Sequence, residues 1–369
     1  MLPRLLPALA LGLALGLAAC DEPLHPHVPN AVGDPGEVVV VTDSMTWAGP
    51  VGEALRATLG RSIAPPLNIA DFQLRRRELT SEGFDLLRRQ RHVIFAAALD
   101  DTSAVARFLE ARLDSAGARL VREGRGAFVV PRRDVWATGQ IVVLAAAGSD
   151  SLLADAFRQH ADTLRTLFTG ATLARLHEDM FSRQRQTAVE DSLLDAHGFT
   201  VNVQHDYFVS QDTTAAPAGL PGHYVRLRRV LSDTWRDLWV YYEDGAAAER
   251  LDTAYVEHVT DRLLETFVRG GYDSSFVRID RARPIRTDSV VLAGRPARET
   301  RGLWRMTEDF MGGPFVRYSF YDPAQRRLYV VFGMVYAPQH RFSGNKREFL
   351  RQLEVIARTF RTADGPAPT

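Results

Sequence analysis

The chain has 369 residues, of which 46% are hydrophobic and 24% are charged, as in ordinary globular proteins. Lysine plus arginine and aspartate plus glutamate each number 45, so the formal net charge is zero and the basic excess typical of nucleic-acid-binding proteins is absent. We therefore expect no nucleic-acid partner. The length allows two domains, each with a hydrophobic core.

The first residues have the three parts of a secretory signal. The amino terminus and Arg4 are positive, residues 5–19 form an apolar run, and small residues precede Cys20. The run is shorter than the roughly 20 residues that cross a bilayer as a helix. The sequence Leu17-Ala18-Ala19-Cys20 resembles the bacterial lipoprotein box, in which the cysteine is acylated. We therefore assign residues 1–20 to a lipoprotein signal peptide and Cys20 to lipidation.

Lipidation of Cys20 would attach the protein to a membrane of the cell envelope through its acyl chains. Inner and outer membrane stay open as locations. Cys20 is the single cysteine of the chain, so no disulfide is expected within it. Residues 21–36 contain four prolines and no apolar period, which predicts a flexible tether.

Residues 37–197 alternate between strand and helix patterns. Residues 37–42 are a β-branched run typical of a buried strand, and Trp47, Val51, Leu55 and Leu59 recur at helical spacing. Further strands are predicted over 93–99, 127–130 and 141–146. Further helices are predicted over 105–113, closed by Gly117, over 153–168, and over 172–196, the last ending at Gly198. These patterns predict an N-terminal α/β half.

Residues 198–362 are richer in strands. Strands are predicted over 199–205, 224–231, 235–242, 289–293, 298–306, 315–321 and 327–336, and helices over 256–267 and 349–360. Short turns between the strands favour an antiparallel sheet with the helices packed on one face. We therefore expect an α+β protein of two halves, with residues 363–369 as a disordered tail.

Several segments of the C-terminal half resemble one known family. These are Trp304, the block Met311-Gly312-Gly313-Pro314-Phe315, residues 335–338, Lys346-Arg347, and residues 351–354. They are similar to bacterial envelope lipoproteins known as domain of unknown function 4837 (DUF4837). The valine run with Trp47 and Gly52, and residues 226–242, also look like that family. The resemblance implies envelope placement and supplies no activity, cofactor or catalytic residue.

One stretch combines aromatic and cationic side chains: Arg226, Arg228, Trp235, Trp239 and Tyr241. On an open sheet face these could stack on sugar rings or hold anionic groups. Alternation places Trp239 and Tyr241 on the same face, which could equally be buried. This face is our candidate binding surface, and an envelope protein or a glycan is the candidate partner.

Gly312 and Gly313 offer a second candidate. Consecutive backbone amides without side chains can form a nest that binds an anion. The same two glycines, followed by Pro314, are equally typical of a turn between two strands.

An enzyme alternative rests on His177, Glu178, His205 and Asp206, since histidines and carboxylates exchange protons near neutral pH. The spacing lacks the Glu-x-x-His that completes a zinc site on a helix, and no Gly-x-Ser-x-Gly motif occurs. We therefore expect a non-catalytic binding or assembly module without a metal or cofactor, with an envelope hydrolase as the alternative.

Overall fold

The computed structural model describes residues 28–232, 234–272, 274–338 and 343–363. The signal peptide with Cys20, residues 21–27 of the expected tether and residues 364–369 of the expected tail lie outside the described residues. No helix within the described ranges is both long enough and apolar enough to cross a membrane.

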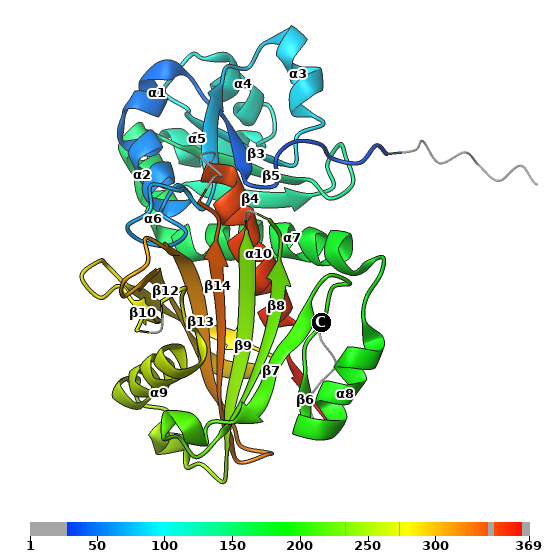
Figure 1. The fold of residues 1–369 in the computed structure, drawn as a ribbon. Helices are drawn as coiled ribbons and strands as arrows, with labels where there is room; N and C mark the ends of the chain where they lie inside the picture. The colour runs from blue at the N-terminus through cyan, green and yellow to red at the C-terminus, as the bar shows by residue number, and fades with distance from the viewer. Residues whose placement is uncertain (1–27, 233, 273, 339–342, 364–369) are drawn as a thin grey trace, which may run out of the picture.

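The chain forms two halves stacked end to end, with helix α7 lying between them (Figure 1). The N-terminal half contains a five-stranded sheet in the order β2-β1-β3-β5-β4, parallel except for β4. Its strands are β1 (Glu37–Val41), β2 (Gln73–Arg77), β3 (His92–Ala98), β4 (Phe128–Arg133) and β5 (Ile141–Ala147). Its helices are α1 (Ser44–Ala48), α2 (Pro50–Thr58), α3 (Ser81–Leu87), α4 (Ala104–Glu110), α5 (Ser115–Arg122), α6 (Asp150–Gln159) and α7 (Ala161–Phe181).

Hydrophobic runs and polar caps explain these elements. Every residue of β3 is buried, as expected for a central strand covered by helices on both faces. Asp43 and Ser103 accept hydrogen bonds from backbone N–H groups at the starts of α1 and α4, respectively. The helix patterns therefore begin where a side chain can satisfy the first unpaired amides.

Three elements of this half escaped the sequence patterns: helix α3, strand β2 and helix α5. The edge strand β2 has the sequence QLRRR and pairs with β1 despite its charge, because its exposed positions alternate with partly buried ones. Helix α5 begins after Asp114, whose carboxylate accepts from the Gly117 N–H at 2.6 Å, so this glycine lies inside a new helix. We had expected Gly117 to end the preceding helix.

The end of the expected tether is ordered. The Ala31 N–H donates to the Thr138 carbonyl at 2.9 Å, the Val32 N–H donates to the Arg89 carbonyl at 2.7 Å, and Ala31 is buried. The segment 29–36 is therefore bound to the N-terminal half, which differs from the expectation of a tether running to Gly36.

The C-terminal half is an antiparallel sheet in the order β10-β12-β13-β14-β9-β8-β7, with β11 paired to β12. Its strands are β7 (Phe208–Thr214), β8 (His223–Val230), β9 (Trp235–Asp244), β10 (Val277–Ile279), β11 (Arg286–Leu292), β12 (Arg295–Met306), β13 (Gly312–Asp322) and β14 (Arg327–Tyr336). Its helices are α8 (Thr187–His197), α9 (Thr253–Phe267) and α10 (Ser343–Arg358), and the two-residue strands β6 (Phe199–Thr200) and β15 (Arg361–Thr362) pair separately.

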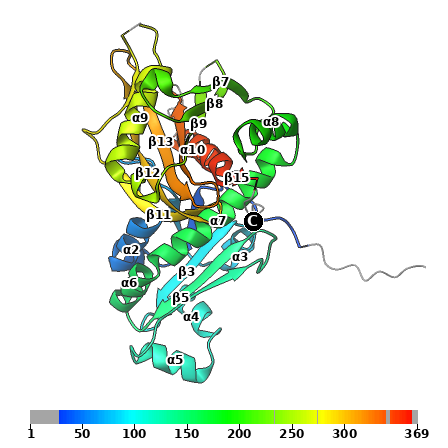
Figure 2. The same cartoon turned by 90° about the horizontal axis from the view of Figure 1, so that it is seen from below.

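Helices pack on both faces of this sheet, whereas we had expected them on one. Val240 and Tyr242 of β9 pack in a core with Leu353 of α10. Trp239 and Tyr241, which point the other way, pack with α9. Figure 2 shows α9 and α10 on opposite sides of the strands. Because both faces are covered at β9, Trp239 and Tyr241 do not lie on an open face.

Helices α7 and α8 differ from their expected bounds. Leu164, Phe168 and Thr172 are buried at a spacing of four residues, so α7 continues through position 170, where we had expected a break. Helix α8 ends at Gly198 in the left-handed conformation, as predicted. Leu193 of α8 packs in the core with α10, so α8 lies with the C-terminal half, although we had placed it in the N-terminal half.

The candidate nest at Gly312 and Gly313 is part of strand β13. Gly313 pairs with Trp304 of β12, and the Trp304 indole passes over it to donate to the Val335 carbonyl at 3.2 Å. A Cβ on Gly313 would lie 1.9 Å from that carbonyl oxygen. The glycine is therefore required for close packing between strands, and it lies in a sheet ladder instead of a free loop.

This packing predicts that Gly313→Ala destabilises the protein by about 2 kcal/mol, because the backbone of β13 or β14 must move to admit the methyl group. Urea unfolding measures the change. Gly126→Ala is the matched control, since a Cβ there meets nothing within 4 Å. Equal unfolding free energies for both variants would contradict the close-packing explanation.

Candidate functional site

The two halves are joined by arginines of α10 that enter the N-terminal half. Arg351 donates to the Asp71 carbonyl at 2.6 Å and to its carboxylate at 3.1 Å, and its guanidinium lies 4.7 Å from the centre of the Phe72 ring. Arg347 lies 3.5 Å from the Asp34 carboxylate. Both arginines are almost fully buried. These contacts fix the helix that forms one wall of the cleft described next.

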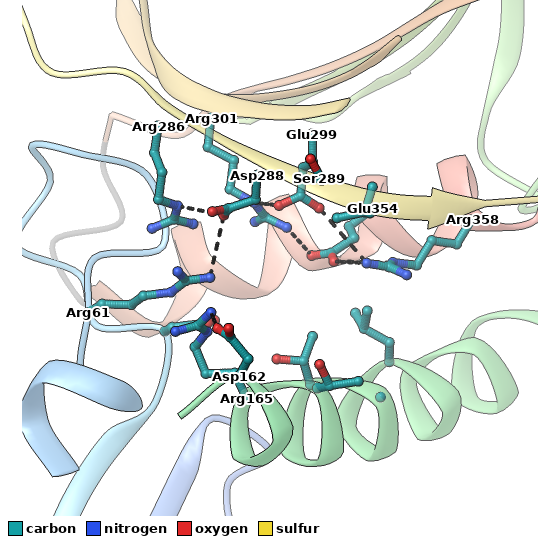
Figure 3. Close-up of a pocket in the computed structure, with 16 residues that line it drawn as sticks. Arg61, Asp162, Arg165, Arg286, Asp288, Ser289, Glu299, Arg301, Glu354 and Arg358 are labelled. Atoms are coloured by element: carbon teal, nitrogen blue, oxygen red, sulfur yellow. Dashed lines mark hydrogen bonds and ion pairs between the residues drawn. The ribbon is translucent and has the colours of Figure 1, made fainter. Parts of the chain in front are cut away.

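A cavity of about 500 Å³ lies between the halves. Helix α7 and the segment between α2 and β2 form one side, and β11, β12 and α10 form the other (Figure 3). Most of the side chains that line it are charged or polar: Arg61, Asp71, Asp162, Arg165, Thr166, Thr169, Arg286, Asp288, Ser289, Glu299, Arg301, Glu354 and Arg358. We call this cavity the interdomain cleft.

One wall of the interdomain cleft is a closed set of buried ion pairs. Arg301 contacts Glu299 at 2.6 Å and Glu354 at 2.8 Å. Arg358 contacts Glu354 at 3.2 Å, and the Tyr318 hydroxyl donates to Glu299 at 2.9 Å. Two guanidiniums and two carboxylates balance one another here, so this wall needs no ligand to neutralise it.

The environment of Glu299 shows which effect dominates in this wall. Burial alone would raise the pKa of the carboxyl, but the Arg301 guanidinium more than offsets it, and Arg358 and the Tyr318 hydroxyl add to the effect. The pKa of Glu299 falls from 4.5 to about 2. Glu299 is therefore ionised at neutral pH and fixes the arginines around it.

Three further arginines line the interdomain cleft outside this wall. Arg61 and Arg286 share one carboxylate, that of Asp288, at 3.6 Å and 3.1 Å. Arg165 of α7 pairs with Asp162, whose side chain is 89% exposed. The third carboxylate, that of Asp71, is already bound by Arg351 at 3.1 Å. Counting Arg351, four guanidiniums thus share three carboxylates, one of them in solvent, and we call Arg61, Arg165 and Arg286 the arginine rim.

Electrostatics at Arg61 show the crowding of guanidiniums. Burial lowers the pKa of the Arg61 guanidinium and the nearby charges of Arg286 and Arg165 lower it further, while the carboxylates of Asp288 and Asp71 offset only part of this. A buried Nε of Arg61 has no hydrogen-bond partner within the described structure. An anion placed among the three guanidiniums would relieve their repulsion.

The expected aromatic surface is buried. Trp239 and Tyr241 have no exposed area and Arg226 is 6% exposed, because α9 covers that face. Arg226 and Arg228 both contact the buried Asp237, at 3.1 Å and 2.7 Å. The structure therefore corrects the expectation of an open binding face at these residues.

Three residues of the predicted binding surface still line a cavity. Trp235, Arg226 and Arg228 line a separate cavity of about 510 Å³ with Trp304 and Met334. Both β8 arginines of this cavity contact Asp237 more closely than Arg61 contacts Asp288, so their guanidiniums are held in place within the protein.

The residues of the enzyme alternative do not converge. His177 contacts the Asn202 amide at 3.2 Å, Asp206 contacts Arg229 at 2.5 Å, and His205 and Glu178 are exposed. Within the described ranges, no three His, Cys, Asp or Glu side chains are arranged to hold a metal ion. The candidate hydrolase site is therefore not assembled.

A histidine and a carboxylate do meet elsewhere. Nε2 of His197 lies 3.0 Å from the Asp212 carboxylate, and its Nδ1 lies 3.0 Å from the Tyr242 hydroxyl. His197 is 8% exposed at the end of α8, so these contacts join that helix to the edge of the C-terminal sheet.

The sequence patterns did not point to the interdomain cleft, although a local signal existed. Arg286 and Asp288 are two residues apart on one strand, as are Glu299 and Arg301 on the next, so each pair shares a face. Glu354 and Arg358 are four apart on a helix. Opposite charges at these spacings indicate ion pairs on one face of a strand or helix.

The buried ion pairs predict an acid-dependent stability. Because the folded-state pKa of Glu299 lies below its unfolded value, ionisation of Glu299 stabilises the fold above about pH 4.5, and this stabilisation is lost as pH falls toward 2. Glu299→Gln should cost about 3 kcal/mol at pH 7, since it leaves buried arginines underpaired.

The difference in unfolding free energy between the wild type and Glu299→Gln should therefore shrink between pH 5 and pH 2, as urea unfolding at each pH can measure. Asp162→Asn is the control, because it removes an exposed carboxylate of the same cleft. A difference that stays constant over this pH range would rule out ionised Glu299 as the stabilising group.

Comparison with known proteins divides the chain in two. Residues 31–181 match the family model described as Domain of unknown function (DUF8532). No curated protein matches the chain. The match to DUF4837 starts at residue 186, so the valine run, Trp47 and Gly52 belong to the other matched region. Residues 186–359 match the model described as Domain of unknown function (DUF4837), and the C-terminal half of the chain belongs to that family.

Proposed function

We propose that the protein is a non-catalytic binding protein, anchored in the cell envelope through acylated Cys20, and that its interdomain cleft binds a small anion. The anchor is supported by the apolar run of residues 5–19, the small residues before the cysteine, and the position of Cys20 as the single cysteine. Inner and outer membrane stay open as locations.

The proposed binding role is supported chiefly by the arginine rim. The arginine rim places Arg61, Arg165 and Arg286 at one cavity with Asp288 as the shared, partly buried counter-charge. Guanidiniums that repel one another in a half-buried site favour a bound carboxylate or phosphate, which accepts several charge-assisted hydrogen bonds at once. The buried ion pairs of Arg301 hold the cleft open and in shape without using this rim.

The size and chemistry of the cleft favour a small molecule over a polymer. Its volume of about 500 Å³ is within the range of small-molecule sites. Its lining contains no aromatic side chain, whereas sugar rings are commonly held by stacking on aromatic residues. A small anion therefore fits the cleft better than the glycan we considered from the sequence, and an envelope protein remains a partner that could act elsewhere on the surface.

Binding is tested with inorganic phosphate and with acetate as probes, by titration calorimetry of the protein lacking its signal peptide. Arg61→Gln should weaken binding about tenfold, because it removes a charge-assisted contact of about 1.5 kcal/mol. Affinity should also fall as salt is added.

Arg158→Gln is the matched control for the loss of one positive charge. Arg158 lies on α6, pairs with Asp155 and does not line the cleft. If neither probe binds the wild type, or if both variants bind equally well, the cleft is not an anion site.

The proposed anchor predicts that Cys20→Ala and the wild type differ in membrane attachment. In bacterial cells the wild type should take up labelled palmitate and sediment with membranes, whereas the variant should take up no label and lose its membrane attachment. Detergent partitioning of the mature protein provides a second readout. A wild type that carries no label and fractionates with soluble proteins would contradict the proposed anchor.

A further inference from the structure

A second cavity, of about 590 Å³, lies next to the interdomain cleft along α7. Gly170, Leu173 and Arg358 line both cavities, so the two meet at this turn of α7 and the facing turn of α10. We call the second space the distal cavity. Ala174 and Val355 add aliphatic surface beside the junction.

The distal cavity is cationic. Arg185, Arg358 and Arg361 line it, Arg358 being the guanidinium that also pairs with Glu354 in the wall of the interdomain cleft, and none of its described lining residues is acidic. The carboxylate that pairs with Arg185 belongs to Glu190, which is 1% exposed and lies behind the wall. Arg361 is 3.8 Å from the same carboxylate. The cavity therefore presents guanidiniums to its interior while the compensating charge stays outside it.

Neutral donors in the distal cavity are oriented by these arginines. Arg361 donates to the Asn202 carbonyl oxygen at 3.3 Å, which turns the Asn202 NH₂ group toward Nε2 of His177, 3.2 Å away. Burial and the Arg185 charge lower the pKa of His177. His177 is thus neutral, accepts this hydrogen bond at Nε2 and carries its proton on Nδ1.

Gly170 marks the junction of the two cavities. A Cβ on this residue would meet nothing within 4 Å, so no neighbour requires a glycine there. Glycine weakens the interior of a helix, and Gly170 lies in the middle of a 21-residue helix. What its missing side chain provides is space where the interdomain cleft opens into the distal cavity.

We infer that the protein binds an elongated ligand with an anionic group at each end, one at the arginine rim and one in the distal cavity, joined by an aliphatic segment that passes Gly170 and Leu173. This inference rests on the proposed function for its first anionic end and adds the second. The end groups are carboxylates or phosphates, both of which guanidiniums recognise.

Such a ligand gains affinity from bivalency. Once one end is bound, the other is confined near its own cavity, so its binding becomes intramolecular and the overall affinity exceeds that of either end alone. The gain requires a chain long enough to pass the junction, and falls when the chain is longer than needed. A length optimum is therefore the signature of two connected sites.

The test uses linear dicarboxylates of four to fourteen carbons, with monocarboxylates of equal length as controls, titrated by calorimetry into the protein without its signal peptide. We expect dicarboxylates of one intermediate length to bind at least about tenfold tighter than their monocarboxylates. Alkane bisphosphonates of the same lengths show which end group is preferred. Absence of a length optimum in both series would overturn the inference.

Gly170→Leu should abolish the tighter binding of dicarboxylates over monocarboxylates, because the leucine side chain fills the junction. Gly170→Ala should keep most of this difference in affinity. Both substitutions favour helix, so circular dichroism and unfolding should show folded proteins in each case. Inorganic phosphate should still bind Gly170→Leu at the arginine rim. If phosphate binds the wild type but Gly170→Leu keeps the gain, the connected sites are refuted while the anion cleft stands; if phosphate fails to bind the wild type, the proposed function itself fails.

Discussion

The insertion of Arg351 into the N-terminal half is the interaction on which the arrangement of the cleft depends. Arg351 is 2% exposed, and its guanidinium donates to the backbone carbonyl and to one carboxylate oxygen of Asp71 and lies over the Phe72 ring. On the same helix, Leu353 and Ile356 pack in the core of the C-terminal half. One helix is thereby fixed in two cores, and the distance across the interdomain cleft follows from its position.

Buried charge in this region sets geometry more than it adds stability. Burying an ion pair costs desolvation that its attraction roughly offsets, but removing one partner leaves the other buried alone. Arg301 with Glu299 and Glu354 therefore resists rearrangement, while Arg61, with its more distant Asp288, can respond to an anion. Arginine thus serves structure in the wall around Arg301 and forms an open rim elsewhere in the same cleft, and the difference lies in how closely each guanidinium is paired.

Much of the fold could be predicted from the sequence because it depends on local patterns. The valine run of β1, the antiparallel pairing of β8 with β9, and the glycine that ends α8 all follow from hydrophobic period and turn chemistry. The aromatic surface could not be judged in this way. Alternation places Trp239 and Tyr241 on one face, but only the tertiary packing of α9 shows that this face is covered.

The cleft escaped prediction for a related reason. Its rim joins Arg61, Arg165 and Arg286, which come from a loop, a helix and a strand far apart in the chain. No local spacing connects them, and the opposite-charge pairs at two and four residues could indicate ion pairs but not a cavity between halves.

The interdomain cleft does not lie where ligands usually bind to a parallel α/β sheet. Ligands of such sheets commonly bind at the carboxyl ends of the strands. Here Arg347 and Arg351 dock beside Asp34 and Asp71, which precede β1 and β2, so the C-terminal half covers the amino ends. Two arginines of the rim come from the region matching DUF8532 and one from the DUF4837 domain. Neither region holds the rim alone, so anion binding at this site would depend on the two being joined in one chain.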